Sequence, residues 1–530
     1  MEPAENLLIV SDLHLSEGWK AEEGGYARSE DFFYDAQFFA FLRHHQALRP
    51  APRYQDKPWL LILNGDTFDF IQVTTLPNEG EELRRVTGVS QYKWLSSHRQ
   101  KYGLGTSPAE SVWKVQQMAQ GHPQFFAALG WFVAQGNRVL FIKGNHDPEL
   151  HWPEVQQALR DVVADAYAAY RQHHAALPEL VREQLDVALA FEPWFYYDRE
   201  RGLYIEHGSQ YEPTNAFRNM LNPVLPHKPQ LLELPRGLLM SRYVYNLLEE
   251  THPYADNVRP TTRAIVWMFR ENALYGLAVL LRRFADLFWA WRELRRKQAE
   301  LDQVDIPNPT PLESYNGLPA ALIAEIVGVA QERSSFSWEV WGKLILEQLS
   351  IGLLSLLGFV AGVVSLYSFV VWGSVEGGLL YLFLSFVLLN GSSIWASIVN
   401  GDEHLDYTPE VACRLADCFR QLDVPLRALI LGHTHIPKQR YVCVSDTQTC
   451  TPDVAAADCD VAQRINVVNT GTWISVASRD PWGWETHLVF CRIASGAALT
   501  DPPEFLEWSP GLDDAHFPLL HWAGKRTLGL

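Results

Sequence analysis

Short apolar runs of the chain end repeatedly in polar turns that carry aspartate, asparagine or histidine. The residues concerned are Asp12, His14, Asp66, Asn145, His146, His207, His433 and His435. Carboxylate, amide oxygen and imidazole are donors that Mn²⁺, Fe or Zn²⁺ accept, and no thiolate accompanies them to favour a structural zinc site. These residue types in this pattern therefore predict a metal centre.

The spacing within the motifs supports the same interpretation. In Asp12-x-His14, alternate residues of an extended segment would point the same way and reach one metal. His433-x-His435 has the same spacing, although a turn could direct its two imidazoles to two metals. Asp66 could bridge two ions about 3.5–4 Å apart, and such a pair binds a phosphoryl group and supplies a hydroxide nucleophile. The glycines beside these residues, where the backbone must approach closely, are Gly65, Gly144, Gly208 and Gly432.

The elements that must position these residues alternate between strand and helix, which predicts a layered α/β domain. The expected strands are Leu7–Val10, Leu60–Leu63, Val139–Ile142, Leu203–Ile205, Ala428–Leu431, Ile465–Val468 and His487–Ile493. The expected helices are Asp31–Leu48, Ala109–Gln135 and Glu154–His174. Ligand crevices in α/β sheets form at the carboxyl ends of strands, so the motifs should meet there.

Five motifs in this order resemble those of the calcineurin-like metallophosphoesterases. They are Asp12-Leu13-His14, Asn64-Gly65-Asp66, Gly144-Asn145-His146-Asp147, His207-Gly208 and Gly432-His433-Thr434-His435. The similarity covers about residues 5–210 and 425–475. It implies a two-layered β-sandwich flanked by helices, with a dinuclear centre of two divalent ions, Mn²⁺ first and Fe or Zn²⁺ as alternatives.

The resemblance also implies a role for each matching residue. The first metal would be held by Asp12, His14, Asp66 and His435. The second would be held by Asp66, Asn145, His207 and His433. His146 would contact the phosphate and help the leaving group depart, and Asp147 would orient His146. Two roles are expected for Asp69 as alternatives: it either supports the metal centre or caps a helix. His122, which matches no motif, is expected to be a surface or core histidine.

Within the family, the opening Ser11–Ser16 and the Gly432–His435 motif are most similar to bacterial UDP-2,3-diacylglucosamine pyrophosphohydrolases, which act on an amphiphile at the membrane. Those enzymes typically have arginine where this chain has His146, so the third motif follows the general family form. A lipid-linked phosphoester is therefore one substrate class that the resemblance suggests.

The overall composition narrows the class of protein. The chain has 530 residues with 44 Lys+Arg and 62 Asp+Glu, a net charge of 44 − 62 = −18, and 47% apolar residues. A disordered or fibrous chain is excluded, and the acidic charge argues against a nucleic-acid partner. The six cysteines form no CxxC pair and are expected to be free thiols, unless Cys443 and Cys450 pair in an oxidising space.

Two apolar runs, Ile351–Trp372 and Leu379–Val399, are 22 and 21 residues long, which predicts a two-helix transmembrane hairpin contacting membrane lipids. A buried helical hairpin is the alternative, which Asn390–Ser393 supports. Residues 259–297 are basic and aromatic and read as a helix on an anionic leaflet or as an exposed helix face. The hairpin and the missing signal peptide predict a membrane protein with its catalytic domain on the cytoplasmic side.

These observations give a fold class and a function. We expect an α/β fold with a metallophosphoesterase-type β-sandwich flanked by helices and a large helical insertion containing the transmembrane hairpin. The expected parts are a catalytic domain in residues 1–210 and 403–530, a helical insertion in 211–340 and the hairpin in 341–402. The expected function is a membrane-anchored metal-dependent phosphoric ester hydrolase that cleaves a phosphomonoester, phosphodiester or pyrophosphate bond. The alternatives are a protein phosphatase or nuclease with the same metal centre and a non-catalytic membrane scaffold.

Overall fold

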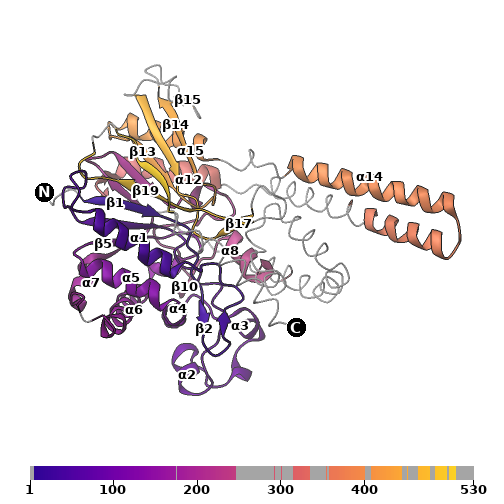
Figure 1. Ribbon diagram of the computed structural model, residues 1–530, viewed down its shortest axis with the longest axis horizontal. Helices are drawn as coiled ribbons and strands as arrows, with labels where there is room; N and C mark the ends of the chain where they lie inside the picture. Colours follow the sequence, from indigo (N-terminus) through magenta and orange to yellow (C-terminus); the bar gives the residue numbers. More distant parts are fainter. Residues whose placement is uncertain are drawn as a thin grey trace. The chain divides into compact units, whose positions relative to one another are not determined.

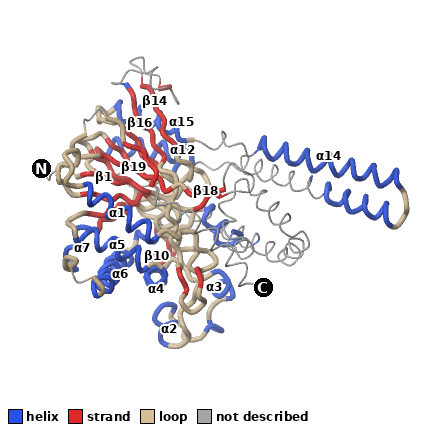
Figure 2. Tube along the Cα trace, in the orientation of Figure 1, coloured by secondary structure: helices blue, strands red, loops and turns tan. Residues whose placement is uncertain are grey.

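The computed structural model describes two compact units of the chain. It describes residues 5–174, 176–245, 292, 296, 300, 314–334, 354, 357–399, 407–444, 450–451, 463–477, 484–497 and 501–508. The first unit contains the described residues up to 334 and from Thr408 onward, and the second contains those between 335 and 407. Figures 1 and 2 show these elements, which together form a mixed α/β fold.

The first unit contains a six-stranded sheet with the order β20-β19-β1-β4-β5-β6. Its strands are β1 (Asn6–Val10), β4 (Trp59–Asn64), β5 (Arg138–Ile142), β6 (Leu189–Glu192), β19 (Leu488–Ile493) and β20 (Glu504–Trp508). The first four are parallel, and β19 and β20 extend the sheet in antiparallel fashion. The central strands are continuously apolar because both faces of the sheet are covered.

A second six-stranded sheet has the order β15-β14-β16-β13-β8-β7. Its strands are β7 (Phe195–Asp198), β8 (Leu203–Glu206), β13 (Ala428–Leu431), β14 (Lys438–Val444), β15 (Cys450–Thr451) and β16 (Arg464–Asn469). The strands β8, β13 and β16 are parallel, while β7 and β14 pair in antiparallel fashion at either side. The seven strands expected from the sequence are therefore all present in these two sheets.

The two sheets pack against each other through one shared apolar layer. Side chains from β1, β4 and β5 meet side chains from β8, β13 and β16 in this layer, including Leu7, Ile9, Ile62, Ile205 and Ile430. The alternate residues of β1, Leu8 and Val10, belong to the larger core on the opposite face of the first sheet. This alternation fixes the register of each strand and so fixes which residues emerge at its end.

Helices cover the outer face of each sheet (Figure 2). On the first sheet lie α1 (Asp35–Leu48), α4 (Pro108–Gly121), α5 (Pro123–Ala134), α6 (Pro153–Gln172) and α7 (Arg182–Ala188). On the second, α15 (Thr408–Gln421) packs Phe419 against Tyr204, and α12 (Ala320–Ser334) lies beside α15. The expected helix Ala109–Gln135 is two helices, because Pro123 cannot donate to the preceding turn and begins a new helix.

Short elements complete the first unit. The helical ones are α2 (Glu81–Thr87), η1 (Tyr92–Trp94), α3 (Ser97–Tyr102), η2 (Pro148–His151), η3 (Ser209–Tyr211), α8 (Arg236–Met240) and η4 (Ser241–Tyr245). The two-stranded sheets pair β2 (Trp19–Lys20) with β3 (Gly25–Tyr26), β9 (Val224–Leu225) with β10 (Lys228–Leu232), β11 (Ser314–Tyr315) with β12 (Leu318–Pro319), and β17 (Ser475–Ala477) with β18 (Trp484–Thr486).

The second unit contains a helical hairpin. Residues 357–370 are helical, and α14 covers Val375–Val399. Small residues bring the two helices together: a Cβ on Gly362 would lie 3.1 Å from the Ser385 hydroxyl, and the Ser365 hydroxyl donates to the Gly378 carbonyl at 2.7 Å.

The predicted transmembrane hairpin is wrong. Among the residues that the structure describes, no helix is long and apolar enough to cross a membrane. In α14, Asn390 and Gly391 interrupt the apolar run that begins at Leu379. The membrane location, with the catalytic domain on the cytoplasmic side, depended on these spans and is corrected with them.

Two further expectations have different outcomes. Cys413 and Cys443 are each disulfide-bonded, so the expectation of free thiols is wrong at these positions. Cys418 and Cys491 are free thiols, as expected. The basic aromatic segment 259–297 lies almost entirely outside the described residues.

Candidate metal centre

The carboxyl ends of five parallel strands carry the predicted ligands. Asp12 follows β1, Asp66 follows β4, Asn145 follows β5, His207 follows β8, and His433 follows β13. The first three strands belong to one sheet and the last two to the other, so the packed sheets bring residues more than 400 positions apart together. The site therefore forms at the edge where ligand crevices are expected in parallel sheets.

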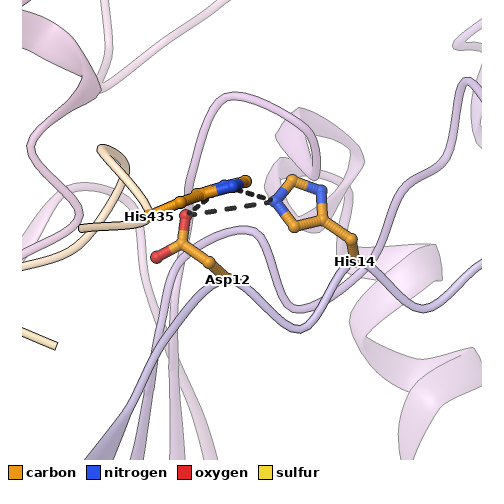
Figure 3. Close-up of side chains that lie close together, drawn as sticks. All are labelled: Asp12, His14 and His435. Carbon is orange, nitrogen blue, oxygen red and sulfur yellow. Dashed lines mark hydrogen bonds and ion pairs between the residues drawn. The ribbon is translucent and has the colours of Figure 1, made fainter. Parts of the chain in front are cut away.

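One group consists of Asp12, His14 and His435, which point toward one another in Figure 3. The Nε2 atoms of His14 and His435 are 3.2 Å apart. Asp12 Oδ1 lies 3.3 Å from His435 Nε2 and 4.0 Å from His14 Nε2. These three side chains supply one carboxylate and two imidazoles around a common point, and they are three of the four ligands predicted for the first metal.

A second group is formed by Asp66, His207 and His433, with Asn145 beside them. His207 Nε2 lies 3.0 Å from Asp66 Oδ2 and 3.1 Å from Asn145 Oδ1. The other ring nitrogen of His207, Nδ1, lies 3.1 Å from the carbonyl oxygen of Asn64. A hydrogen bond from Nδ1–H to that carbonyl would fix the ring and leave Nε2 as the donor to a metal.

Asp66 lies between the two groups. Its Oδ2 atom is 3.0 Å from His207 Nε2 and 3.9 Å from His14 Nε2. Its Oδ1 accepts a hydrogen bond of 2.7 Å from the backbone N–H of His146, which fixes the carboxylate. Asp66 Oδ2 therefore lies near histidines of both groups, and the bridging role of Asp66 stays a prediction.

The backbone at the site is unusual. Five predicted ligands have positive φ angles: Asp12 (54°), His14 (51°), Asp66 (48°), His433 (70°) and His435 (59°). Left-handed conformations of non-glycine residues cost about 1–3 kcal/mol each and cluster at functional sites. The spacing of Asp12-x-His14 predicts an extended segment, and this prediction is wrong, because both residues have left-handed backbone conformations. The turn alternative for His433-x-His435 fits the structure, because the two imidazoles join different groups.

Two glycines allow the strand ends to approach the ligands. Gly65 has φ of 80°, and a Cβ there would collide with the ring of His207. A Cβ on Gly144 would collide with the carboxylate of Asp66. The packing of the ligands themselves thus requires glycine at both positions.

Asp69 contacts the imidazole of His146. Asp69 Oδ2 lies 2.6 Å from His146 Nδ1 and 3.6 Å from His14 Nδ1. The family resemblance implies that Asp147 orients His146, but Asp147 accepts backbone hydrogen bonds from Gly144 at 2.6 Å and Thr67 at 2.9 Å. Asp147 therefore joins the loops after β4 and β5, and the hydrogen bonds assign the orientation of His146 to Asp69.

Two residues near the second group were not predicted. Glu212 Oε2 lies 2.5 Å from His433 Nε2, and Asn215 Nδ2 lies 3.4 Å from the same nitrogen. Both follow the short helix η3 after His207. They belong to none of the motifs, so only the fold reveals them. Glu212 adds a second carboxylate, beside Asp66, to this end of the site.

A buried ionic network supports the segment after His14. His122 lies between two carboxylates, with Nε2 3.1 Å from Glu30 and Nδ1 3.0 Å from Asp35. Burial alone would lower the pKa of His122, but the charges of Asp35 and Glu30 raise it to about 10. Glu30 also accepts backbone hydrogen bonds from Ser16 at 3.2 Å and Gly18 at 2.6 Å. His122 is thus a core histidine, one of the two expected alternatives, and it neutralises the carboxylate that shapes this segment.

The electrostatics of the site fit divalent cations. Asp12 and Asp66 are 0% and 1% exposed, so their charges have almost no contact with water. Burial alone would lower the pKa of His207, but Asp66 and Asp12 raise it to about 9. A proton on this imidazole thus offsets buried negative charge in the protein without metal. Two divalent ions would offset the same buried negative charge, and the carboxylate oxygens and imidazole nitrogens of the site are suitable donors for them.

In comparisons with known proteins, no protein-family model, no curated protein and no solved structure matches this chain.

Proposed function

We propose that this protein is a dinuclear metal-dependent phosphoesterase that hydrolyses a phosphomonoester, phosphodiester or pyrophosphate bond. The observation that carries the proposal is the convergence of two Asp/His groups on one carboxylate, Asp66. Two metal sites sharing a bridging carboxylate are typical of phosphoryl-transfer centres. The resemblance of the five motifs to calcineurin-like metallophosphoesterases supports the same activity.

The residues of the two groups would hold the ions. Asp12, His14 and His435 would hold the first, Asn145, His207 and His433 would hold the second, and Asp66 would bridge them. When bound, such ions polarise the phosphoryl oxygens and activate a water nucleophile. Mn²⁺ is the preferred ion because the donors are oxygen and imidazole nitrogen, with Fe or Zn²⁺ as alternatives.

His146 would act on the substrate. Its side chain is 17% exposed, whereas the side chain of the neighbouring Asp66 is 1% exposed, so the imidazole is accessible from solvent. Asp69 Oδ2 lies 2.6 Å from Nδ1 and so orients the ring, and the substrate would meet the solvent-facing side of this imidazole. A protonated His146 would stabilise developing charge there and donate a proton to the departing oxygen.

Turnover of simple substrates tests this function. We expect hydrolysis of p-nitrophenyl phosphate, bis(p-nitrophenyl) phosphate or pyrophosphate with added Mn²⁺, and loss of that activity with a chelator. The matched control is His173→Ala, which removes an exposed histidine at the end of α6 and should leave the rate unchanged. Absence of turnover with Mn²⁺, Fe²⁺ and Zn²⁺ on all three substrates would contradict the proposal.

A further inference from the structure

A second site lies at the opposite ends of the same parallel strands. A cavity of about 890 Å³ is lined by the first residues of β8, β13 and β16, namely Leu203, Ala428 and Arg464. The predicted metal ligands His207 and His433 follow the last residues of β8 and β13, so the cavity and the candidate metal centre lie at different edges of the sheet. Cavities of about 300–1,000 Å³ are typical of small organic ligands.

The described lining of this cavity is rich in arginine. Its arginines are Arg53, Arg201, Arg420, Arg427, Arg464 and Arg492. The acidic residues of the same lining are Asp423, Asp501 and Glu504. Six positive and three negative charges of the lining give 6 − 3 = +3, and counting Asp198 and Asp417, which pair with Arg201 and Arg420 from outside the lining, gives 6 − 5 = +1, in a chain whose net charge is −18. A positive cavity in an acidic protein attracts anions and concentrates them locally.

Several of these guanidinium groups are already held in place. Arg53 and Arg492 share one carboxylate, with Glu504 Oε1 3.0 Å from Arg53 Nη1 and Glu504 Oε2 2.8 Å from Arg492 Nε. Arg201 pairs with Asp198 at 2.8 Å, and Arg464 lies 5.2 Å from the ring centre of Tyr441. Fixed guanidinium planes lose less side-chain entropy when a ligand binds.

We propose that this cavity binds a small phosphorylated molecule that carries at least two phosphoryl groups. Guanidinium forks match phosphate oxygens in bidentate geometry, and several of them around one cavity suit more than one phosphoryl group. The volume exceeds that of a single phosphate, and Tyr441 with Arg464 offers a flat surface for an organic group. The site is independent of the proposed phosphoesterase activity.

Calorimetric titration of the intact protein with ADP, pyrophosphate and monophosphate tests the proposal. The test variants are Arg427→Gln, Arg464→Gln and the double variant, and Arg427→Lys keeps the charge without the fork. Arg84→Gln on α2 is the matched control, because Arg84 is a surface arginine outside the cavity. Asp66→Asn separates this cavity from the metal centre, where phosphates could also bind.

We expect ADP or pyrophosphate to bind both the wild type and Asp66→Asn. Each arginine variant should weaken binding about tenfold and the double variant about a hundredfold, as expected for charge-assisted hydrogen bonds. If ADP binds more tightly than pyrophosphate, the cavity recognises an organic group in addition to the phosphates. If the two bind equally, the cavity recognises only the phosphates. The proposal is overturned if neither binds, if monophosphate binds equally well, or if Asp66→Asn abolishes binding while the arginine variants retain it. Unchanged melting temperatures would show that the variants fold.

Discussion

The two ends of the parallel strands carry opposite charges on different kinds of side chain. At the carboxyl ends, short carboxylates and imidazoles are buried or partly buried, and five of them have left-handed backbone conformations. At the amino ends, long arginine side chains from separate segments surround a cavity. At the carboxyl ends, the backbone conformation holds the donor atoms in position. At the amino ends, ion pairs such as Arg53–Glu504–Arg492 hold the guanidinium groups in position.

This difference indicates what each edge can do. Metal coordination requires donor atoms at defined positions, and short side chains on constrained strand ends supply them. Recognition of a phosphorylated anion tolerates longer and more adaptable side chains, because the guanidinium fork itself provides the geometry. Substitutions at the carboxyl edge should therefore affect catalysis strongly, and comparable substitutions at the amino edge should leave it unchanged.

Asp66→Asn should have the largest effect. Loss of the bridging charge removes a ligand from both metals, so we expect turnover to fall by more than about 10³-fold. The comparison at the other edge is Asp423→Asn, an exposed aspartate of the arginine cavity, which should retain wild-type turnover. Steady-state rates on the same aryl phosphate measure both. Near-normal turnover of Asp66→Asn would remove Asp66 from the centre.

His146→Ala should lower turnover by about 10²–10⁴-fold while the metals remain bound, because this residue is assigned to the substrate. Asp69→Asn should cost less, about 10–100-fold, since Asp69 acts by orienting His146. Turnover and elemental analysis of the same samples distinguish the two roles. Loss of metal from His146→Ala would instead make His146 a ligand.

Gly65→Ala should displace His207 and reduce occupancy of the second metal, because the new Cβ collides with the imidazole. Gly136→Ala is a close control: Gly136 has φ of 81°, against 80° at Gly65, but its Cβ would meet nothing within 4 Å. Both variants should lose stability through backbone strain, of about 1 kcal/mol. Only Gly65→Ala should lose metal, and equal metal contents in the two variants would contradict the packing explanation.

His122→Gln should have the smallest effect on turnover and a distinct effect on stability. The pKa of His122 is raised to about 10 in the folded protein, above an ordinary value of 6.5. Its stabilising contribution is therefore complete below about pH 6.5 and is lost as the pH rises through about 10. Melting temperatures between pH 6.5 and 10 should fall more steeply for the wild type than for His122→Gln. Parallel slopes would show that His122 is neutral in the folded protein.

The sequence predicted the strands and the main site residues because both depend on local patterns. Apolar runs such as Leu60–Leu63 and polar turns such as Asn64-Gly65-Asp66 are contiguous, so spacing identifies them. The contacts of Asp69 with His146 and of Glu212 with His433 could not be predicted from the sequence, because they arise from tertiary packing. The arginines of the cavity are likewise scattered through the chain and form no motif.

The hairpin shows where a local pattern misled. Apolar length predicted two membrane spans, but length does not reveal how small residues such as Gly362 and Ser385 pack against each other. The left-handed backbone at Asp12 and His14 was also invisible in the sequence, since aspartate and histidine are compatible with both extended and left-handed conformations.

The most direct test of the central claim is the number of Mn²⁺ ions bound per chain, measured by elemental analysis after gel filtration. We predict two ions per chain for the wild type and fewer than one for Asp66→Asn, because the shared carboxylate belongs to both sites. A wild-type protein that binds a single ion, or an Asp66→Asn variant that keeps two, would contradict a dinuclear centre bridged by Asp66.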